Sequence, residues 1–207
     1  KIVEVLPTEY IAFVISELRS KAVWAAQHRF GCRTILRLVH HVSSGRWGSQ
    51  AAAKVIDELL PHTIDLTYDK FGNYVMQEVL EHGLPHQRRR VGQNLLRDAV
   101  GTSLTQHGSR VVEKALRLCD APEVAALANV LLSGHSGHHQ HHGGAVRHMA
   151  CSECGCFVLR ALVRSEVHYM QAALALRPLV AELRRTRQGR RLLAPVFKGA
   201  EAFDEED

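Results

Sequence analysis

Apolar residues recur along this chain in a fixed frame that follows five glycines. These glycines are Gly31, Gly72, Gly108, Gly155 and Gly189. The residues three, four, seven and eight positions after each glycine fall on one face of an α-helix. Nineteen of these twenty positions are apolar, and Thr34 is the exception. The pattern therefore predicts five amphipathic helices, called the glycine helices below, each with one stripe for burial.

The spacing of the glycines predicts a repeat protein. They lie 41, 36, 47 and 34 residues apart, and periods of this length are typical of stacked helical units. Further amphipathic stretches, such as Ile11–Leu18 and Ala52–Leu59, lie between the glycine helices. The run Gln87–Arg90 is expected to lie on a solvated outer face. We therefore expect an all-α fold, a solenoid of paired or tripled helices.

Polar residues next to Gly72 suggest contact with a nucleic-acid base. Asn73 and Tyr74 stand at positions +1 and +2 from this glycine, and Gln77 stands at +5. The two amides are four residues apart on one helix face and can both donate and accept hydrogen bonds, which suits the edge of uracil. The tyrosine ring can stack on the face of a base.

The same three positions after the other glycines hold different chemistry. They are Cys32, Arg33 and Leu36; Ser109, Arg110 and Glu113; and Cys156, Phe157 and Arg160. A carboxylate only accepts hydrogen bonds, so Glu113 favours guanine, which presents N1–H and N2–H₂. Arg110 can stack its planar guanidinium on a base. An ordinary surface pair of Glu113 and Arg110 is the alternative explanation of these two residues.

These residues resemble the Pumilio (PUF) family of RNA-binding domains, whose repeats each contact one base from a helix. GCRTIL, FGNYVMQEVLEHG and GSRVVEKAL are similar to the family's fifth, sixth and seventh repeats. Arg177–Gly199 is similar to the half-repeat that closes the domain. The resemblance covers nearly the whole chain. It implies a right-handed, armadillo-like α-solenoid with the glycine helices on its concave face, single-stranded RNA as the partner, no cofactor and no catalysis.

Two repeats depart from the family pattern. The family has Gln where Leu36 stands, and Asn, Tyr and Gln where Cys156, Phe157 and Arg160 stand. Leu36 cannot hydrogen-bond, so the discrimination of adenine is expected to be relaxed. Arg160 only donates, which favours acceptor-rich edges such as that of cytosine.

We expect a partial Pumilio homology domain over residues 1–200. Residues 1–5 would end a preceding repeat, and the repeats 6–46, 47–83, 84–119 and 120–165 would be followed by a C-terminal cap, 166–200. Residues 134–144 form a His/Gly-rich insertion, expected to be mobile, and residues 201–207 form an acidic tail. The chain begins at Lys1 without Met, so we expect further repeats to precede it.

Composition narrows the picture only slightly. A net charge of +5 and a pI of about 9.1 permit a polyanionic partner without requiring one. Five cysteines at irregular spacing favour reduced thiols in an intracellular compartment, and no apolar run is long enough for a membrane span. The histidines of the insertion could bind zinc, as could Cys151, Cys154 and Cys156 beside His148, but the repeat frame explains the cysteines without metal. No metal site is expected.

The sequence thus predicts a sequence-specific binder of single-stranded RNA. The resemblance implies targets in mRNA 3′-untranslated regions with a UGUA-like core, post-transcriptional repression in the cytoplasm, a monomer, and protein corepressors on the convex face. Strand polarity inherited from the family gives 5′-(C/U)GUA-3′. A ribosomal-RNA-processing Pumilio relative and a protein-binding helical scaffold are the alternatives. No nucleophile–base set or phosphate-cradling glycine loop accompanies the repeats, which disfavours an enzyme.

Overall fold

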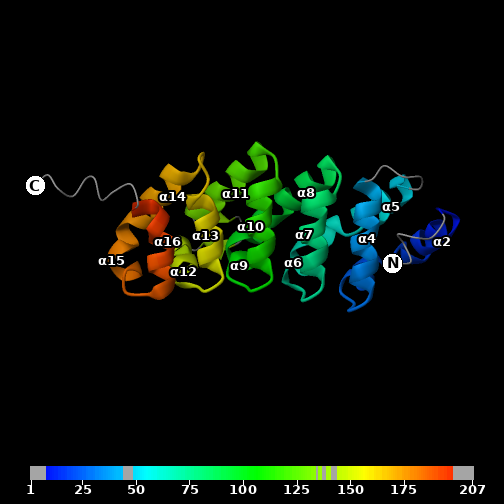
Figure 1. Ribbon diagram of the computed structural model, residues 1–207, viewed down its shortest axis with the longest axis horizontal. Coiled ribbons are helices and arrows are strands. Elements are labelled where there is room, and N and C mark those ends of the chain that lie inside the picture. The colour runs from blue at the N-terminus through cyan, green and yellow to red at the C-terminus, as the bar shows by residue number, and fades with distance from the viewer. Residues whose placement is uncertain (1–7, 44–48, 134, 137–138, 141–143, 198–207) are drawn as a thin grey trace, which may run out of the picture.

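The protein is an elongated row of helices (Figure 1). The computed structural model describes residues 8–43, 49–133, 135–136, 139–140 and 144–197. In these ranges the regular structure is helical apart from one short pair of strands. The predicted all-α class is therefore confirmed. The expectations for residues 1–5 and 201–207 lie outside the described residues.

Each unit of the row contains a second-row helix, a short helix and a glycine helix, in that order. The second-row helices are α2 (Thr8–Leu18), α5 (Ser49–Asp57), α8 (Pro85–Leu95), α11 (Ala121–Ser133) and α14 (Tyr169–Leu176). The short helices are α3 (Ala22–Ala26), α6 (Thr63–Tyr68), α9 (Ala99–Ser103), α12 (Ala145–Cys151) and α15 (Val180–Leu183). The glycine helices are α4 (Gly31–Ser43), α7 (Gly72–His82), α10 (Gly108–Leu118), α13 (Gly155–Val163) and α16 (Arg187–Phe197). The 3₁₀ turns η1 (Leu60–His62), η2 (Leu96–Asp98) and η3 (Arg177–Leu179) precede α6, α9 and α15.

The units stack through their long helices. Each glycine helix packs against the next, from α4 to α7, α10, α13 and α16, so that these five helices form one continuous face. In the second row, α8 packs against α11, and α11 against α14. The apolar stripe of the glycine helices is buried: Ile35, Met76, Val112 and Leu159 are each fully inaccessible to solvent. One core therefore runs along the row, as expected when repeats bury each other's apolar faces.

The glycine that opens each frame allows two backbones to approach closely. A Cβ atom on Gly72 would lie 2.8 Å from the carbonyl oxygen of Leu66, in the preceding short helix. A Cβ on Gly155 would lie 2.6 Å from the Cα of Met149. The other three glycines also face the backbone of the residue six positions earlier. A side chain at these positions would push the short helix away, which is why glycine recurs there.

A polar side chain three positions before each glycine caps the first turn. Asp69 Oδ1 accepts hydrogen bonds from the backbone N–H groups of Phe71 (2.8 Å) and Gly72 (2.7 Å). At the other glycines the acceptors are His28 Nδ1 (3.3 Å), Thr105 Oγ1 (3.1 Å), Ser152 Oγ (3.2 Å) and Thr186 Oγ1 (3.0 Å). These bonds satisfy N–H groups that a helix start leaves without a partner. Because the capping residues differ in type, this second part of the frame is not evident from the sequence alone.

The insertion between α11 and α12 contains two short antiparallel strands. β1 (His135–Ser136) pairs with β2 (His139–Gln140), with His135 opposite Gln140. The intervening residues 137–138, and residues 134 and 141–143, lie outside the described part of the chain. The expected mobility of this insertion stays a prediction.

One expectation for the second row was wrong. Gln87 is fully buried rather than solvated, and its Nε2 donates to Asp57 Oδ1 (2.8 Å) and to the carbonyl oxygen of Ala53 (3.2 Å). Both acceptors belong to the preceding unit, so Gln87 joins two repeats. The neighbours Arg89 and Arg90 are exposed, as expected.

Among the described residues, no helix is both long and apolar enough to cross a membrane.

Candidate nucleic-acid interface

The twelve predicted site residues follow one pattern of exposure on four neighbouring glycine helices. The +1 residues are buried: Cys32, Asn73, Ser109 and Cys156. The +2 residues are exposed: Arg33, Tyr74, Arg110 and Phe157. The +5 residues are half-buried: Leu36, Gln77, Glu113 and Arg160. Since the four helices lie side by side, the structure brings all twelve residues onto one face, with a flat +2 group projecting from every helix.

On α7 the two amides are in contact, but they are not equally accessible. Gln77 Nε2 donates to Asn73 Oδ1 (3.1 Å), and Asn73 Nδ2 donates to the carbonyl oxygen of Asp69 (2.8 Å). Asn73 is only 1% exposed, whereas Tyr74 is 49% exposed. In this state Gln77 is therefore the amide nearer the surface, and Asn73 supports it from below. The sequence placed both amides on one helix face and did not distinguish their exposure.

A slot lies between α10 and α13. Its volume is about 230 Å³, and its lining is Gln106, Ser109, Arg110, Glu113, Cys154 and Phe157. The guanidinium of Arg110 and the ring of Phe157 are the flat exposed groups of the two helices, whereas Ser109 is 4% exposed. Flat groups from adjacent repeats, with a carboxylate between them, can hold a planar ligand that presents hydrogen-bond donors.

A second hollow of about 400 Å³ adjoins the slot, because Glu113 and Phe157 line both. Its further lining includes Arg160 and His168. The Glu113 side chain is thus accessible from both the slot and this second hollow.

On α13 the arginine at +5 is held inside its own repeat. The guanidinium carbon of Arg160 lies 4.9 Å from the centroid of the Phe157 ring. Its Nε is buried without a hydrogen-bond partner among the described residues. Burial raises the pKa of the neighbouring Cys156 thiol, against the opposing effect of the Arg160 charge, and so keeps the thiol protonated at neutral pH. The expected outward-facing donor is therefore partly replaced by a stacked pair of Arg160 and Phe157.

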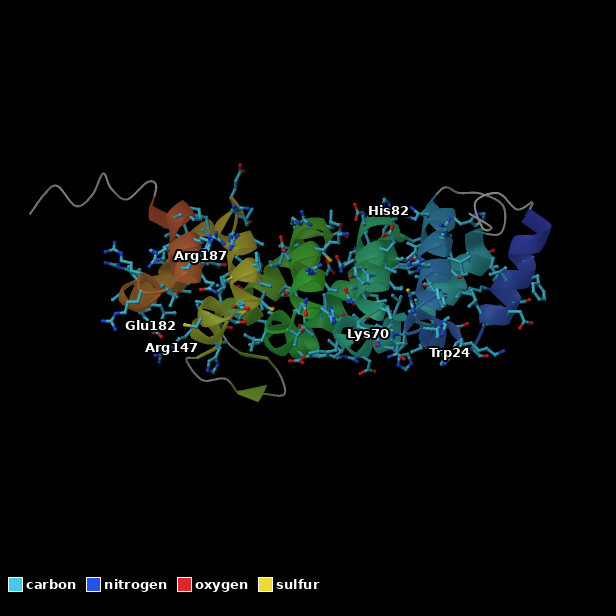
Figure 2. The ribbon with its side chains drawn as sticks, turned by 60° about the horizontal axis from the view of Figure 1, so that its bottom comes forward. Trp24, Lys70, His82, Arg147, Glu182 and Arg187 are labelled. Atoms are coloured by element: carbon cyan, nitrogen blue, oxygen red, sulfur yellow. The ribbon has the colours of Figure 1, made fainter. Side chains whose placement is uncertain are left out.

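On α4 no side chain at +5 can hydrogen-bond, because Leu36 packs against the core. The Cys32 thiol donates to the carbonyl oxygen of Arg29 (3.5 Å), which leaves Arg33 as the outward group. The sequence analysis missed two exposed aromatic residues close to this helix, Trp24 (67%) and Phe30 (60%). Trp24, seen near the N-terminal end of the row in Figure 2, stacks on His28 with ring centroids 5.1 Å apart.

The last glycine helix carries no such triplet. Arg190, Arg191 and Ala194 at its +1, +2 and +5 positions are exposed, and Arg190 Nη1 donates to the carbonyl oxygen of Arg184 (3.0 Å). This helix supplies positive charge rather than a base-sized slot.

Among the described residues, the three cysteines Cys151, Cys154 and Cys156 do not form a group with metal-ligand geometry. The group of His, Cys, Asp or Glu side chains that does is His40, Glu78 and His82, on α4 and α7.

Three segments of the chain match a family of known proteins. A family model described as the Pumilio-family RNA binding repeat matches residues 25–45, 62–96 and 102–132. These segments contain α4, α7 and α10 together with the capping residues His28, Asp69 and Thr105; of the three short helices that precede them, only α6 lies wholly within a matched segment.

Two curated relatives and one solved structure illustrate the likeness. Pumilio homology domain family member 4 of Saccharomyces cerevisiae is 24% identical over 93% of this chain and 21% of its own length. Pumilio homolog 12 of Arabidopsis thaliana is 28% identical over 53% of this chain and 18% of its own length. The Puf4 RNA binding domain bound to the HO endonuclease RNA 3′ UTR recognition sequence superposes with a TM-score of 0.78 at 18% identity, over 97% of this chain and 59% of that one. At that identity the superposition shows the fold, a helical-repeat solenoid. The chain spans about a fifth of the length of these two relatives.

Proposed function

The chain is a Pumilio-type repeat domain, and from this premise we propose that it binds single-stranded RNA in a sequence-specific manner, without catalysis. The observation that carries the proposal is the repeated exposure pattern at +1, +2 and +5. A helix needs no exposed flat group to pack in a solenoid, yet Arg33, Tyr74, Arg110 and Phe157 project from consecutive repeats. Stacking of bases on such groups is a common basis of single-strand recognition.

The slot between α10 and α13 accounts for a preference for guanine. A base inserted between Arg110 and Phe157 would stack on both, and its edge would meet Glu113. Guanine offers two donors, N1–H and N2–H₂, to the carboxylate oxygens. Uracil and adenine each offer one donor group, N3–H or N6–H₂, next to an acceptor, so one carboxylate oxygen would face an acceptor and lose its hydrogen bond.

The other repeats extend this preference into a short sequence. Gln77, supported by Asn73, suits uracil. The α4 repeat, with Leu36 and Arg33, accepts adenine through packing. On α13, the Arg160 guanidinium donates and favours a pyrimidine with acceptor atoms, although its stack on Phe157 limits its reach. With the family's strand polarity, the proposed core is 5′-(C/U)GUA-3′.

The biological role we propose follows the relatives. The Puf4 domain named above is bound to a 3′ UTR sequence. We propose that this chain likewise binds mRNA 3′-untranslated regions in the cytoplasm, as a monomer, and takes part in post-transcriptional repression. Protein corepressors would contact the second-row helices, which lie opposite the RNA-binding face.

The proposal is tested by fluorescence anisotropy with an octanucleotide that contains CUGUA, and with the same RNA carrying A, C or U in place of the guanine. The wild-type chain should bind the guanine-containing RNA at least tenfold more tightly than the variants, since a lost pair of charge-assisted hydrogen bonds costs about 1.5–3 kcal/mol. Binding should weaken as salt is raised.

A double substitution then tests the assignment of the slot. Ser109→Asn with Glu113→Gln makes the α10 positions chemically equivalent to Asn73 and Gln77, so the preference should move from guanine to uracil. Glu166→Gln, which removes an exposed carboxylate outside the slot, is the matched control and should leave the preference unchanged. An unaltered guanine preference in the double variant contradicts the assignment, and equal affinity for all RNA sequences contradicts sequence-specific binding itself.

A further inference from the structure

Two histidines and a glutamate from neighbouring repeats converge at the C-terminal ends of α4 and α7. The Nε2 atom of His40, on α4, lies 2.7 Å from Glu78 Oε1, on α7. His82 Nε2 lies 3.5 Å from the same oxygen. The two imidazole rings are themselves 4.5 Å apart between centroids, with their planes inclined by 39°. His82 is labelled at the edge of the row in Figure 2.

An ion pair explains only part of this arrangement. One protonated histidine against one carboxylate is a common surface pair, and His86 with Asp57 provides an example elsewhere in this protein (3.2 Å). A second imidazole against the same oxygen is not needed for such a pair. If both histidines were protonated, their charges would repel at this short separation.

Two neutral imidazoles and a carboxylate are instead a donor set that divalent transition metals favour. One ligand atom from each of the three residues lies within 4.8 Å of the other two. Ligands bound to Zn²⁺ at about 2.0–2.2 Å in a tetrahedron lie roughly 3.3–3.6 Å from one another. Glu78 and His82 are four residues apart on one helix face, so small side-chain rotations bring all three atoms to that spacing. We propose that His40, Glu78 and His82 bind one divalent transition metal ion of the Zn²⁺ type.

The position of the site determines what a bound ion would do, in two respects. It joins α4 to α7, and so ties two consecutive repeats together. The side chains of His40, Glu78 and His82 are 56%, 20% and 38% exposed, so solvent reaches the fourth ligand position. Glu78 follows Gln77 and lies one helical turn beyond Tyr74, so this open position lies on the face that carries the +2 and +5 residues. Water or another oxygen ligand can occupy it.

The neighbouring charges have partners of their own. Glu81, one residue before His82, pairs with Lys114 of α10. The ion pair with Lys114 thus neutralises the Glu81 carboxylate, which leaves Glu78 as the oxygen ligand of the cluster.

The test measures the binding of Zn²⁺ and Co²⁺ to metal-free protein by isothermal titration calorimetry and by Co²⁺ absorption. The five histidines between residues 135 and 142 are a second set of imidazole donors that would confuse a metal titration, so all proteins carry serine at those positions. This background should bind one ion with a micromolar dissociation constant. The unfolding temperature should rise by about 5–10 °C at a hundredfold excess over that constant. Bound Co²⁺ should give intense visible bands, because it occupies a tetrahedral or five-coordinate site.

Three variants and a control locate the ion. His40→Ala, Glu78→Gln and His82→Ala should each weaken binding at least tenfold and abolish the Co²⁺ bands, with unchanged circular dichroism. His86→Ala removes the comparable histidine–carboxylate pair with Asp57 and should bind metal like the background. The proposal is overturned if the background protein binds no ion, or if any of the three variants keeps its full affinity. Neither result depends on RNA binding.

Discussion

At the scale of single residues, the exposed groups at +2 make the face of the glycine helices suited to stacking bases. Tyr74 and Phe157 leave about half of their area in water, 49% and 48%, although both sit on helices whose opposite face is fully buried. Half-exposed rings on a packed scaffold offer a stacking surface that loses little conformational freedom on binding, because the helix already fixes their direction.

Tyr74→Ala should therefore weaken RNA binding without unfolding the protein. The loss of one stacked base costs about 1–3 kcal/mol, which corresponds to a fivefold or greater rise in the dissociation constant. Tyr74→Phe keeps the ring and should stay within about threefold of the wild type. Anisotropy titrations and circular dichroism measure the two properties separately. Met170→Ala, at a 64% exposed position on α14, is the control away from the face. Equal affinities for Tyr74→Ala and wild type would mean that RNA does not contact α7.

The positions of these residues could be predicted from the sequence, but their side-chain contacts could not. The count from the glycine placed Tyr74 and Gln77 on the helix surface, because helical periodicity is enough for that. Asn73 is buried because a backbone oxygen in the preceding turn accepts its amide. Arg160 rests on Phe157 instead of pointing outward. Such choices depend on rotamers and on local acceptors, which no sequence pattern specifies.

At the scale of the helix, two devices place the start of each glycine helix: the close approach at the glycine and the cap three residues before it. Only the glycine was visible as a sequence signal. The capping residues differ in type, from His28 and Asp69 to Thr105, so no single letter repeats. What they share is an acceptor atom on a short side chain, which becomes evident once the glycine frame is aligned with the structure.

Gly108→Ala should destabilise the protein despite the better helix propensity of alanine. The added Cβ would meet the carbonyl oxygen of Thr102 and the hydroxyl of Thr105. Overpacking of this kind costs about 1–3 kcal/mol, against at most about 1 kcal/mol gained from propensity. Urea unfolding followed by circular dichroism gives the difference. Gln106→Ala, an exposed change two residues earlier, serves as the control, and an equally stable Gly108→Ala would show that the close approach relaxes freely.

Asp69→Ala should remove the cap of α7. Its carboxylate accepts from two backbone N–H groups, so its loss should lower the free energy of unfolding by about 1 kcal/mol. Asp69→Ser should retain most of that stability, since a serine hydroxyl can accept one of the two bonds. Asp65→Ala changes a carboxylate that is 74% exposed on the preceding helix, and the expected change is within about 0.5 kcal/mol. The same urea experiment ranks the three variants, and a loss for Asp65→Ala as large as that for Asp69→Ala would contradict the capping role.

At the scale of the whole molecule, the contacts that matter run between neighbours in the row. Sequence period and apolar stripes predicted this architecture, because they depend on local repetition. The joints between units could not be predicted, since their partners lie about one repeat apart: Gln87 with Asp57, and Asn94 Nδ2 with the carbonyl oxygen of Leu60 (2.7 Å). The cluster of His40, Glu78 and His82 escaped notice for the same reason, because two helices must be in register before it exists.

Replacing residues 135–143 by a five-residue Gly-Ser linker should leave the row intact. The insertion joins α11 to α12, and shortening a loop changes its closure free energy only slowly with length. The free energy of unfolding should change by less than about 1 kcal/mol in chemical denaturation with chelator present in both samples. A larger loss would show that the strands β1 and β2, or the residues around them, support the neighbouring helices.

The close approach at each glycine has a consequence for how such a chain can evolve. The positions that fix a helix in the row, at −6, −3, 0, +3, +4, +7 and +8, are distinct from the exposed position +2 and the half-buried position +5. Mutations at the exposed +2 positions are therefore close to neutral for folding, and a lineage can drift in specificity while its architecture persists. Leu36 and Arg160 depart from the family pattern on helices whose glycines and caps are in place. Separate sites for anchoring and for recognition make each repeat an independently variable unit of inheritance.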